Sequence, residues 1–180
     1  MQKQKTYTVD ICGQKAELPV IKIGPELSIV FFNLHGNVKL TEFCAEEIAK
    51  IVWGADVVLT AESKGLQLAH CVARILGHNF YAVARKSKKL YMQDGLSVQV
   101  KSVTTAEPQH LYLSESSAAL LKDKKVAIVD DVISSGGSLK GLETLAELAG
   151  GTVYKKAAVL AEGKAGERKD IAFLAKIPLL

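Results

Sequence analysis

The residues with the clearest chemistry lie between positions 126 and 138, which read Val-Ala-Ile-Val-Asp-Asp-Val-Ile-Ser-Ser-Gly-Gly-Ser. An apolar run ends in two adjacent carboxylates, Asp130 and Asp131, which could hold ribose hydroxyls or Mg²⁺. The small residues that follow can offer hydroxyls and backbone N–H groups to a phosphate: Ser134, Ser135, Gly136, Gly137 and Ser138. A sugar phosphate would satisfy both halves of this segment.

The loop that these small residues form, here called the 134–138 loop, has the properties of an anion site. Its paired glycines allow the backbone to approach a ligand closely. The helix predicted from about Ser138 to Ala149 would direct its unpaired N–H groups at that ligand. A hydrogen bond to a charged acceptor contributes only about 1.5–3 kcal/mol, so several donors must converge. The alternative, a plain strand–turn–helix junction, does not account for acids, glycines and hydroxyls in this order.

A second loop has the same arrangement of strand, loop and helix. The stretch Thr60-Ala61-Glu62-Ser63-Lys64-Gly65 follows a short apolar strand, Val57 to Leu59, and opens a helix. Two such loops side by side could hold the two phosphate ends of one substrate. The simpler reading is a capped helix start with a solvated lysine.

A basic run follows the next strand, Phe80 to Ala84, and consists of Arg85, Lys86, Lys88 and Lys89. Charge runs are usually solvated. This one falls at the sheet edge where ligands bind in open α/β folds, so it is also a candidate site element.

The elements that must position these residues alternate along the chain. Apolar patterns predict strands at 57–59, 80–84, 126–129 and 152–161, and helices at about 40–52, 69–76 and 138–149. Such alternation favours right-handed crossovers and a parallel sheet. A hairpin is expected within 7–23, a further strand at 27–34, and a long excursion with hairpin character at 85–122. The apolar tail at 171–180 is expected to pack on the domain or on a partner subunit.

The composition limits the classes of protein that fit. A chain of 180 residues with 48% apolar residues suits one compact domain. It contains neither an apolar run of membrane-spanning length nor a signal-peptide pattern, so a cytoplasmic protein is expected. Cys12, Cys44 and Cys71 are predicted to be buried free thiols. Trp53 is predicted to belong to the core. The net charge of +4 favours anionic partners, and a phosphorylated small molecule explains it as well as nucleic acid does.

Residues 126–138 resemble the phosphoribosyl-pyrophosphate motif of type I phosphoribosyltransferases. The resemblance implies an α/β fold with a central, mostly parallel sheet flanked by helices, a small hood and a flexible hairpin loop. It implies one domain over 1–180, with the hood and entry strands mainly in 1–40, the flexible loop in 85–122 and a packed tail in 171–180. Asp130 and Asp131 would hold the ribose hydroxyls, with Mg²⁺ nearby, and the 134–138 loop would hold the 5′-phosphate.

The resemblance extends to three other segments. The Glu62–Gly65 run is similar to the pyrophosphate loop of adenine phosphoribosyltransferases, which makes Ser63, Lys64 and Gly65 pyrophosphate contacts. The Arg85–Leu90 segment resembles both adenine and xanthine enzymes, with Arg85 and Lys89 expected to act in catalysis and Lys86 in substrate binding. A purine contact is expected from Asn33 of the hood, and Glu162 and Lys164, in the loop after the last core strand, are expected to contact the purine or the 5′-phosphate edge. The plain alternatives are a turn-capping pair for Asn33 and His35, and a polar turn at 162–164.

These features predict a glycosyltransferase of purine salvage. The expected reaction joins adenine to 5-phosphoribosyl 1-pyrophosphate, with Mg²⁺ as cofactor, and gives AMP and pyrophosphate. Xanthine or another 6-oxopurine is the alternative base. A non-catalytic regulator that senses phosphoribosyl pyrophosphate and binds RNA is the alternative class, although a nucleic-acid partner and a membrane are not expected. The resemblance also implies a homodimer.

Overall fold

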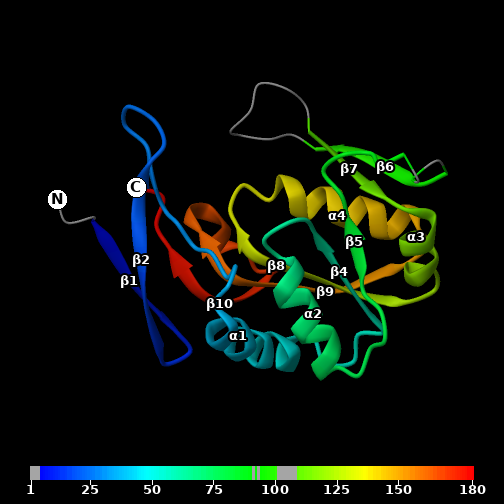
Figure 1. Ribbon diagram of the computed structural model, residues 1–180, viewed down its shortest axis with the longest axis horizontal. Helices are drawn as coiled ribbons and strands as arrows, with labels where there is room; N and C mark the ends of the chain where they lie inside the picture. The colour runs from blue at the N-terminus through cyan, green and yellow to red at the C-terminus, as the bar shows by residue number, and fades with distance from the viewer. Residues whose placement is uncertain (1–4, 91, 93, 101–108) are drawn as a thin grey trace.

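The computed structural model describes residues 5–90, 92, 94–100 and 109–180. Its centre is a five-stranded sheet in the order β10-β9-β8-β4-β5, in which every neighbouring pair is parallel (Figure 1). The strands are β4 (Val57–Ala61), β5 (Ala82–Ala84), β8 (Lys125–Ile133), β9 (Thr152–Glu162) and β10 (Ala172–Ile177). The predicted fold class, a mostly parallel sheet flanked by helices, is confirmed.

Helices cover both faces of this sheet (Figure 1). On one face α1 (Val38–Ile51) and α2 (Leu66–Ile75) pack against Val58, Ala127 and Val129. On the other face α4 (Gly137–Leu148) and α3 (Glu115–Leu121) pack against Leu59 and Ile128. Because successive strand residues point to opposite faces, the continuous apolar runs of β4 and β8 supply both cores.

The hood is a separate antiparallel sheet built from β1 (Thr6–Ile11), β2 (Gln14–Lys22) and β3 (Ser28–Val30). The end of the chain closes onto it. Ser28 and Leu180 exchange backbone hydrogen bonds of 2.7 and 3.1 Å, and Leu179 bridges Ile29. The apolar tail therefore packs on its own domain, through β10 against β9 and then through this bridge.

The predicted hairpin between 85 and 122 is present as β6 (Leu96–Val100) and β7 (Gln109–Leu113). Residues 101–108, which belong to the predicted flexible loop, lie outside the described residues. The hairpin joins the sheet edge where Arg85 bridges Tyr112, and it packs over α4. Helix α3, which the sequence patterns did not predict, follows directly, with the Ser114 hydroxyl capping the N–H of Ser117.

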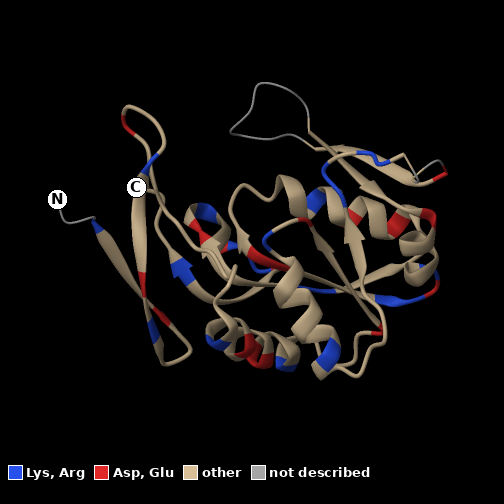
Figure 2. Ribbon diagram, in the orientation of Figure 1, with Lys and Arg blue, Asp and Glu red and all other residues tan. Residues whose placement is uncertain are grey.

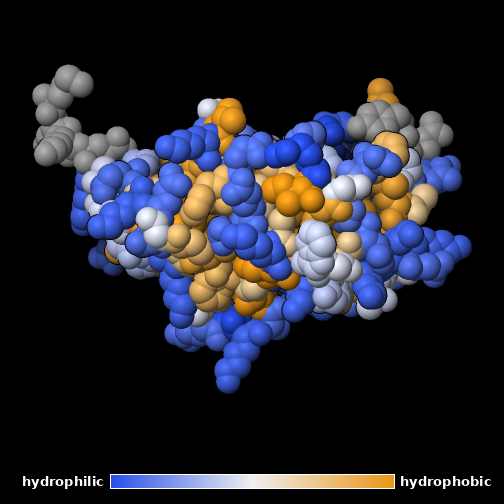
Figure 3. All heavy atoms as spheres, turned by 90° about the horizontal axis from the view of Figure 1, so that it is seen from below, coloured by the Kyte–Doolittle hydropathy of each residue, from blue (hydrophilic) through white to orange (hydrophobic). Residues whose placement is uncertain are grey.

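Two burial predictions were wrong. Trp53 follows the end of α1 and is 69% exposed, and Cys12 lies exposed in the β1–β2 turn, whereas Cys44 and Cys71 are buried as expected. Apolar residues also reach the surface on the side of α1 and α2 (Figure 3). Within the described residues, no helix combines the length and the apolar character needed to cross a membrane.

Candidate active site

Strand β8 places the acidic pair at the carboxyl end of the sheet. It lies between β9 and β4, so both of its edges are paired and only its end is open to a ligand. Asp131 is 5% exposed and Asp130 is partly buried. The backbone N–H of Asp131 donates to Oδ1 of Asp130 over 2.9 Å, which ties the two residues together.

The electrostatics of this pair oppose ionisation of both carboxyls. Burial, followed by the neighbouring charge of Asp131, raises the pKa of Asp130 well above its ordinary value, and Lys86 acts in the opposite sense. Burial also raises the pKa of Asp131, against the attraction of Lys64. Oδ2 of Asp131 is buried without a hydrogen-bond partner among the described residues. The pair therefore offers acceptor capacity that donors or a cation could use.

The 134–138 loop leads from β8 into α4. Gly136 precedes the helix with a φ of +82°, a left-handed conformation that favours glycine. The first turn of a helix has N–H groups without intrahelical partners, so the start of α4 presents donors at this edge of the sheet. The arrangement is the one predicted from the sequence, with the helix beginning at Gly137.

The 62–65 loop approaches the acidic pair from β4. Its Glu62–Ser63 peptide bond is cis, and Gly65 precedes α2. A Cβ on Gly65 would lie 2.4 Å from Oγ1 of Thr60 and 3.0 Å from Oδ1 of Asp130. Only glycine fits there without displacement, so the 62–65 loop meets the acidic pair at this contact.

Glu62 connects this loop to the basic run. Its carboxylate pairs with Nε of Arg85 at 2.8 Å and accepts the backbone N–H of Lys86 at 2.7 Å. The sequence analysis did not single out Glu62 as a site residue. Its position in the Glu-Ser-Lys-Gly run was the available signal, but its partners are 23 and 24 residues away, so spacing could not identify them.

Lys64 connects the loop to the hood. Its ammonium group donates to the carbonyl of Phe32 at 3.3 Å and lies 4.6 Å from the ring centroid of Phe31. The same cation faces Asp131 electrostatically, so it spans the space between hood and sheet.

These elements enclose a cavity of about 640 Å³. Predicted site residues from four separate segments line it: Lys64, Lys86, Ser134, Ser135, Gly137, Ser138, Glu162 and Lys164. Apolar side chains of the hood and the tail, such as Ile23, Leu27 and Leu179, line the rest, and they are 48%, 39% and 56% exposed. The cavity thus combines polar anion-binding loops with an apolar wall suited to a flat ring.

Other predicted residues do not line this cavity. Ser63, Gly65, Gly136 and the acidic pair belong to the same loops and to the end of β8 but are not among the lining residues. Arg85 is held by Glu62, and Lys89, which is partly buried, accepts the N–H of Met92 through its backbone carbonyl. Asn33 lines a different hollow, where its Oδ1 accepts the N–H of His35 at 3.0 Å. The turn-capping alternative describes the contacts of Asn33.

The donor set fits a magnesium ion held mainly by substrate and water. Among the described residues, no group of three or more His, Cys, Asp or Glu side chains is arranged to hold a metal. The buried, unpartnered Oδ2 of Asp131 beside Asp130 suits Mg²⁺, which typically binds one or two carboxylates together with substrate oxygens.

Comparison with known proteins gives a consistent result. The sequence profile of the family described as phosphoribosyl transferase domain matches residues 35–176. An adenine phosphoribosyltransferase of Petrotoga mobilis is 27% identical over 132 residues, which cover 71% of this chain and 73% of that protein. A xanthine phosphoribosyltransferase of Brevibacillus brevis is 28% identical over 132 residues, covering 72% and 66%. A probable purine biosynthesis transcriptional regulator of Streptococcus pneumoniae is 34% identical over 107 residues, covering 55% of this chain and 37% of the regulator.

The fold has close structural relatives as well. The crystal structure of an adenine phosphoribosyltransferase from Thermoanaerobacter pseudethanolicus superposes with a TM-score of 0.74 at 24% identity, over 89% of this chain and 95% of the other. The adenine and xanthine relatives are about equally similar in sequence, so similarity alone does not select a base.

Proposed function

Because this chain belongs to the phosphoribosyl transferase family, an enzyme family of glycosyltransferase type, we propose that it transfers phosphoribosyl to a purine, and that the purine is adenine. The products would be AMP and pyrophosphate. One observation carries the proposal: a single cavity unites the 134–138 loop, Lys64 of the 62–65 loop and an apolar hood wall. Phosphoribosyl pyrophosphate has two anionic ends, and a purine is a flat aromatic ring with a polar edge.

We assign the roles of the residues from their positions. The hydroxyls and amides of the 134–138 loop bind the 5′-phosphate, Asp130 and Asp131 accept hydrogen bonds from the ribose hydroxyls, and Ser63 to Gly65 bind the pyrophosphate. The base nitrogen forms a bond to the anomeric carbon as the bond to pyrophosphate oxygen breaks, with inversion at that carbon, and the proton of that nitrogen passes to the released pyrophosphate or to water. The protein contributes positioning and fixed charge, which are the main sources of catalysis in such transfers.

Mg²⁺, when bound with the substrate, would neutralise pyrophosphate charge. We assign Asp130 and Asp131 as the protein residues that would hold the ion, through water or through ribose hydroxyls. Removing the metal with a chelator should abolish turnover, and adding Mg²⁺ back should restore it.

Two observations support adenine over xanthine. The Glu62–Gly65 run is of the adenine type, and Asn33, which matched the xanthine enzymes, lies outside the cavity. Glu162 and Lys164 both line the cavity, and we assign them to the base. A carboxylate suits the amino group of adenine, whereas an ammonium suits the oxygen of a 6-oxopurine.

The deciding experiment assays radiolabelled adenine, hypoxanthine, guanine and xanthine with phosphoribosyl pyrophosphate and Mg²⁺. We expect turnover with adenine, and loss of that turnover in the double variant Asp130→Asn/Asp131→Asn with the fold intact. Turnover of xanthine alone would establish a xanthine phosphoribosyltransferase instead. Salt-dependent RNA binding without turnover of any base would establish the regulator instead.

The distribution of charged residues bears on the alternative that the protein is an RNA-binding regulator. Figure 2 shows Lys and Arg interspersed with Asp and Glu on α1 and α4, whereas a nucleic-acid site needs a concentrated basic face. We further propose that the protein is cytoplasmic, that it forms a homodimer, and that residues 1–180 form a single domain. Light scattering of the purified protein would test the oligomeric state.

A further inference from the structure

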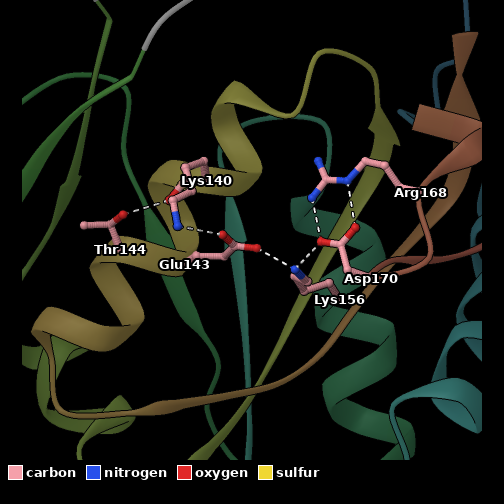
Figure 4. Close-up of polar contacts among 6 residues, drawn as sticks. All are labelled: Lys140, Glu143, Thr144, Lys156, Arg168 and Asp170. Atoms are coloured by element: carbon pink, nitrogen blue, oxygen red, sulfur yellow. Dashed lines mark hydrogen bonds and ion pairs between the residues drawn. The ribbon is translucent and has the colours of Figure 1, made fainter. Parts of the chain in front are cut away.

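A chain of charged residues lies beside the 134–138 loop and takes no part in the proposed reaction (Figure 4). It begins on α4, passes through β9 and ends in the segment after the 3-10 helix Gly163–Glu167. The separations between nitrogen and oxygen are 3.3 Å for Lys140 and Glu143, 2.6 Å for Glu143 and Lys156, and 2.6 Å for Lys156 and Asp170. Asp170 then holds Arg168.

Arg168 is fixed by a two-pronged contact. Its Nε donates to one oxygen of Asp170 at 2.9 Å and its Nη2 donates to the other at 2.7 Å. Such paired bonds set the plane and the direction of a guanidinium group. They leave Nη1 as the nitrogen that faces away from Asp170.

That third nitrogen lies against Gly136. A Cβ built on Gly136 would lie 2.6 Å from Nη1 of Arg168. The guanidinium therefore occupies the space beside the loop at the residue whose φ of +82° turns the chain into α4. The loop is packed against a cation on the side where a side chain would otherwise project.

The charges along this chain stabilise one another, and the Arg168 and Asp170 side chains at its end are 33% and 49% exposed. Arg168 first, and then Lys156, hold the pKa of Asp170 well below its usual range. Burial lowers the pKa of Lys156, but hydrogen bonds to Asp170 and Glu143 outweigh this and raise it. The side chains of Lys156 and Glu143 are only 16% and 14% exposed, so this part of the chain is shielded from solvent.

Arg168 also ends the segment that carries Glu162 and Lys164, which line the cavity. Its backbone N–H donates to the carbonyl of Ala165 at 3.2 Å, at the close of the 3-10 helix that follows Glu162. One residue therefore connects the cavity-lining segment 162–164 with the loop assigned to the 5′-phosphate.

We propose that Arg168 is a positioning residue: its guanidinium, held by Asp170, fixes the 134–138 loop at Gly136 in the shape that receives the 5′-phosphate. The assignment of the 5′-phosphate to this loop rests on the proposed function, whereas the fixing of the loop by Arg168 does not. The residue acts through the loop backbone, and displacing a binding group by about 1 Å can cost roughly 100-fold in rate.

The test uses Arg168→Ala, Asp170→Asn, which keeps the arginine but weakens its hold, and the control Arg74→Ala. Arg74 pairs with Glu42 at 2.6 Å on the helical face remote from the loop. Affinities for ribose 5-phosphate and for magnesium pyrophosphate are measured by calorimetry. Amide hydrogen exchange of residues 134–138 is measured in the ligand-free protein.

We expect Arg168→Ala to weaken ribose 5-phosphate binding by roughly 10- to 100-fold, with magnesium pyrophosphate binding within about twofold of wild type. Exchange at 134–138 should become at least roughly tenfold faster, while exchange at 62–65 stays unchanged. Asp170→Asn should shift both quantities in the same direction by less, and Arg74→Ala should shift neither.

Unchanged exchange at 134–138 in both Arg168→Ala and Asp170→Asn would overturn the proposal. Equal losses for ribose 5-phosphate and pyrophosphate would also overturn it, because they would indicate general damage. If wild-type protein bound neither ligand, the proposed function would fail, and the exchange data alone would decide the role of Arg168.

Discussion

Replacing Asp130 by Asn should make the ligand-free protein more stable while it removes activity. In the wild type, burial and the neighbouring Asp131 both oppose ionisation of this carboxyl. Asparagine has nearly the same shape, and its side-chain oxygen can still accept the 2.9 Å hydrogen bond from the N–H of Asp131. The substitution therefore removes the unfavourable charge and keeps the local geometry.

The expected increase in the free energy of unfolding can be estimated. Relieving one unfavourable charge typically contributes about 0.5–2 kcal/mol to the free energy of unfolding. For a domain of this length, 1 kcal/mol corresponds to about 2–4 °C in Tm, so Asp130→Asn should raise Tm by roughly 1–8 °C at neutral pH.

The pH dependence gives a second, independent readout. A carboxyl whose pKa is raised on folding stabilises the protein fully below its unfolded value, 3.8, and that stability is lost as pH rises through the higher folded value. Wild-type Tm should therefore carry a component that falls as pH rises above 3.8. The variant should lack this component.

Thermal unfolding of both proteins between about pH 4 and 8, followed by circular dichroism, measures both effects. Arg74→Ala serves as a control for an exposed charge outside the site. A lower Tm for Asp130→Asn at neutral pH, or the same slope with pH in both proteins, would show that the buried carboxyl is not a source of instability.

Two further substitutions test the edge of the site. Gly65→Ala should lower the free energy of unfolding by about 1–3 kcal/mol and abolish turnover, because its Cβ would lie 2.4 Å from Oγ1 of Thr60; denaturant unfolding and the adenine assay check this. Glu62→Gln should lower kcat/KM roughly tenfold by releasing Arg85, yet change the free energy of unfolding by less than about 1 kcal/mol, as measured by steady-state kinetics and urea unfolding. Normal turnover in either variant would contradict the assigned packing.

The parts of the site that the sequence could predict are those encoded by contiguous residues. Residues 126–138 contain a strand, two acids, a glycine-serine loop and a helix start within one short stretch, so local rules were sufficient. The 62–65 loop was predictable for the same reason. Both occur where the carboxyl ends of parallel strands meet, which is why two independent local signals converged on one cavity.

The contacts between these segments were not predictable, because they join distant positions by shape. Nothing in the spacing of Glu62 and Arg85, or of Gly136 and Arg168, indicates that they meet. The same limit explains the errors at Trp53 and Cys12: residue type favours burial, but tertiary position decides it. Helix α3 was missed because seven residues give too short an apolar pattern within a stretch that otherwise suggested a hairpin.

The charges around the cavity share one physical explanation. Lys64, Lys86 and Lys164 line it as cations, while Asp130 and Asp131 lie beneath it and resist ionisation together. A ligand with anionic ends and hydroxyls between them would satisfy both groups at once. Ligand binding should therefore add to wild-type stability by mass action, as RT ln(1 + [L]/Kd). Asp130→Asn should gain stability without the ligand and lose the increment with it, so the two proteins should become similar in Tm as phosphoribosyl pyrophosphate is added. If the variant kept its lead at saturating ligand, the acidic pair would be a structural liability without a role in binding.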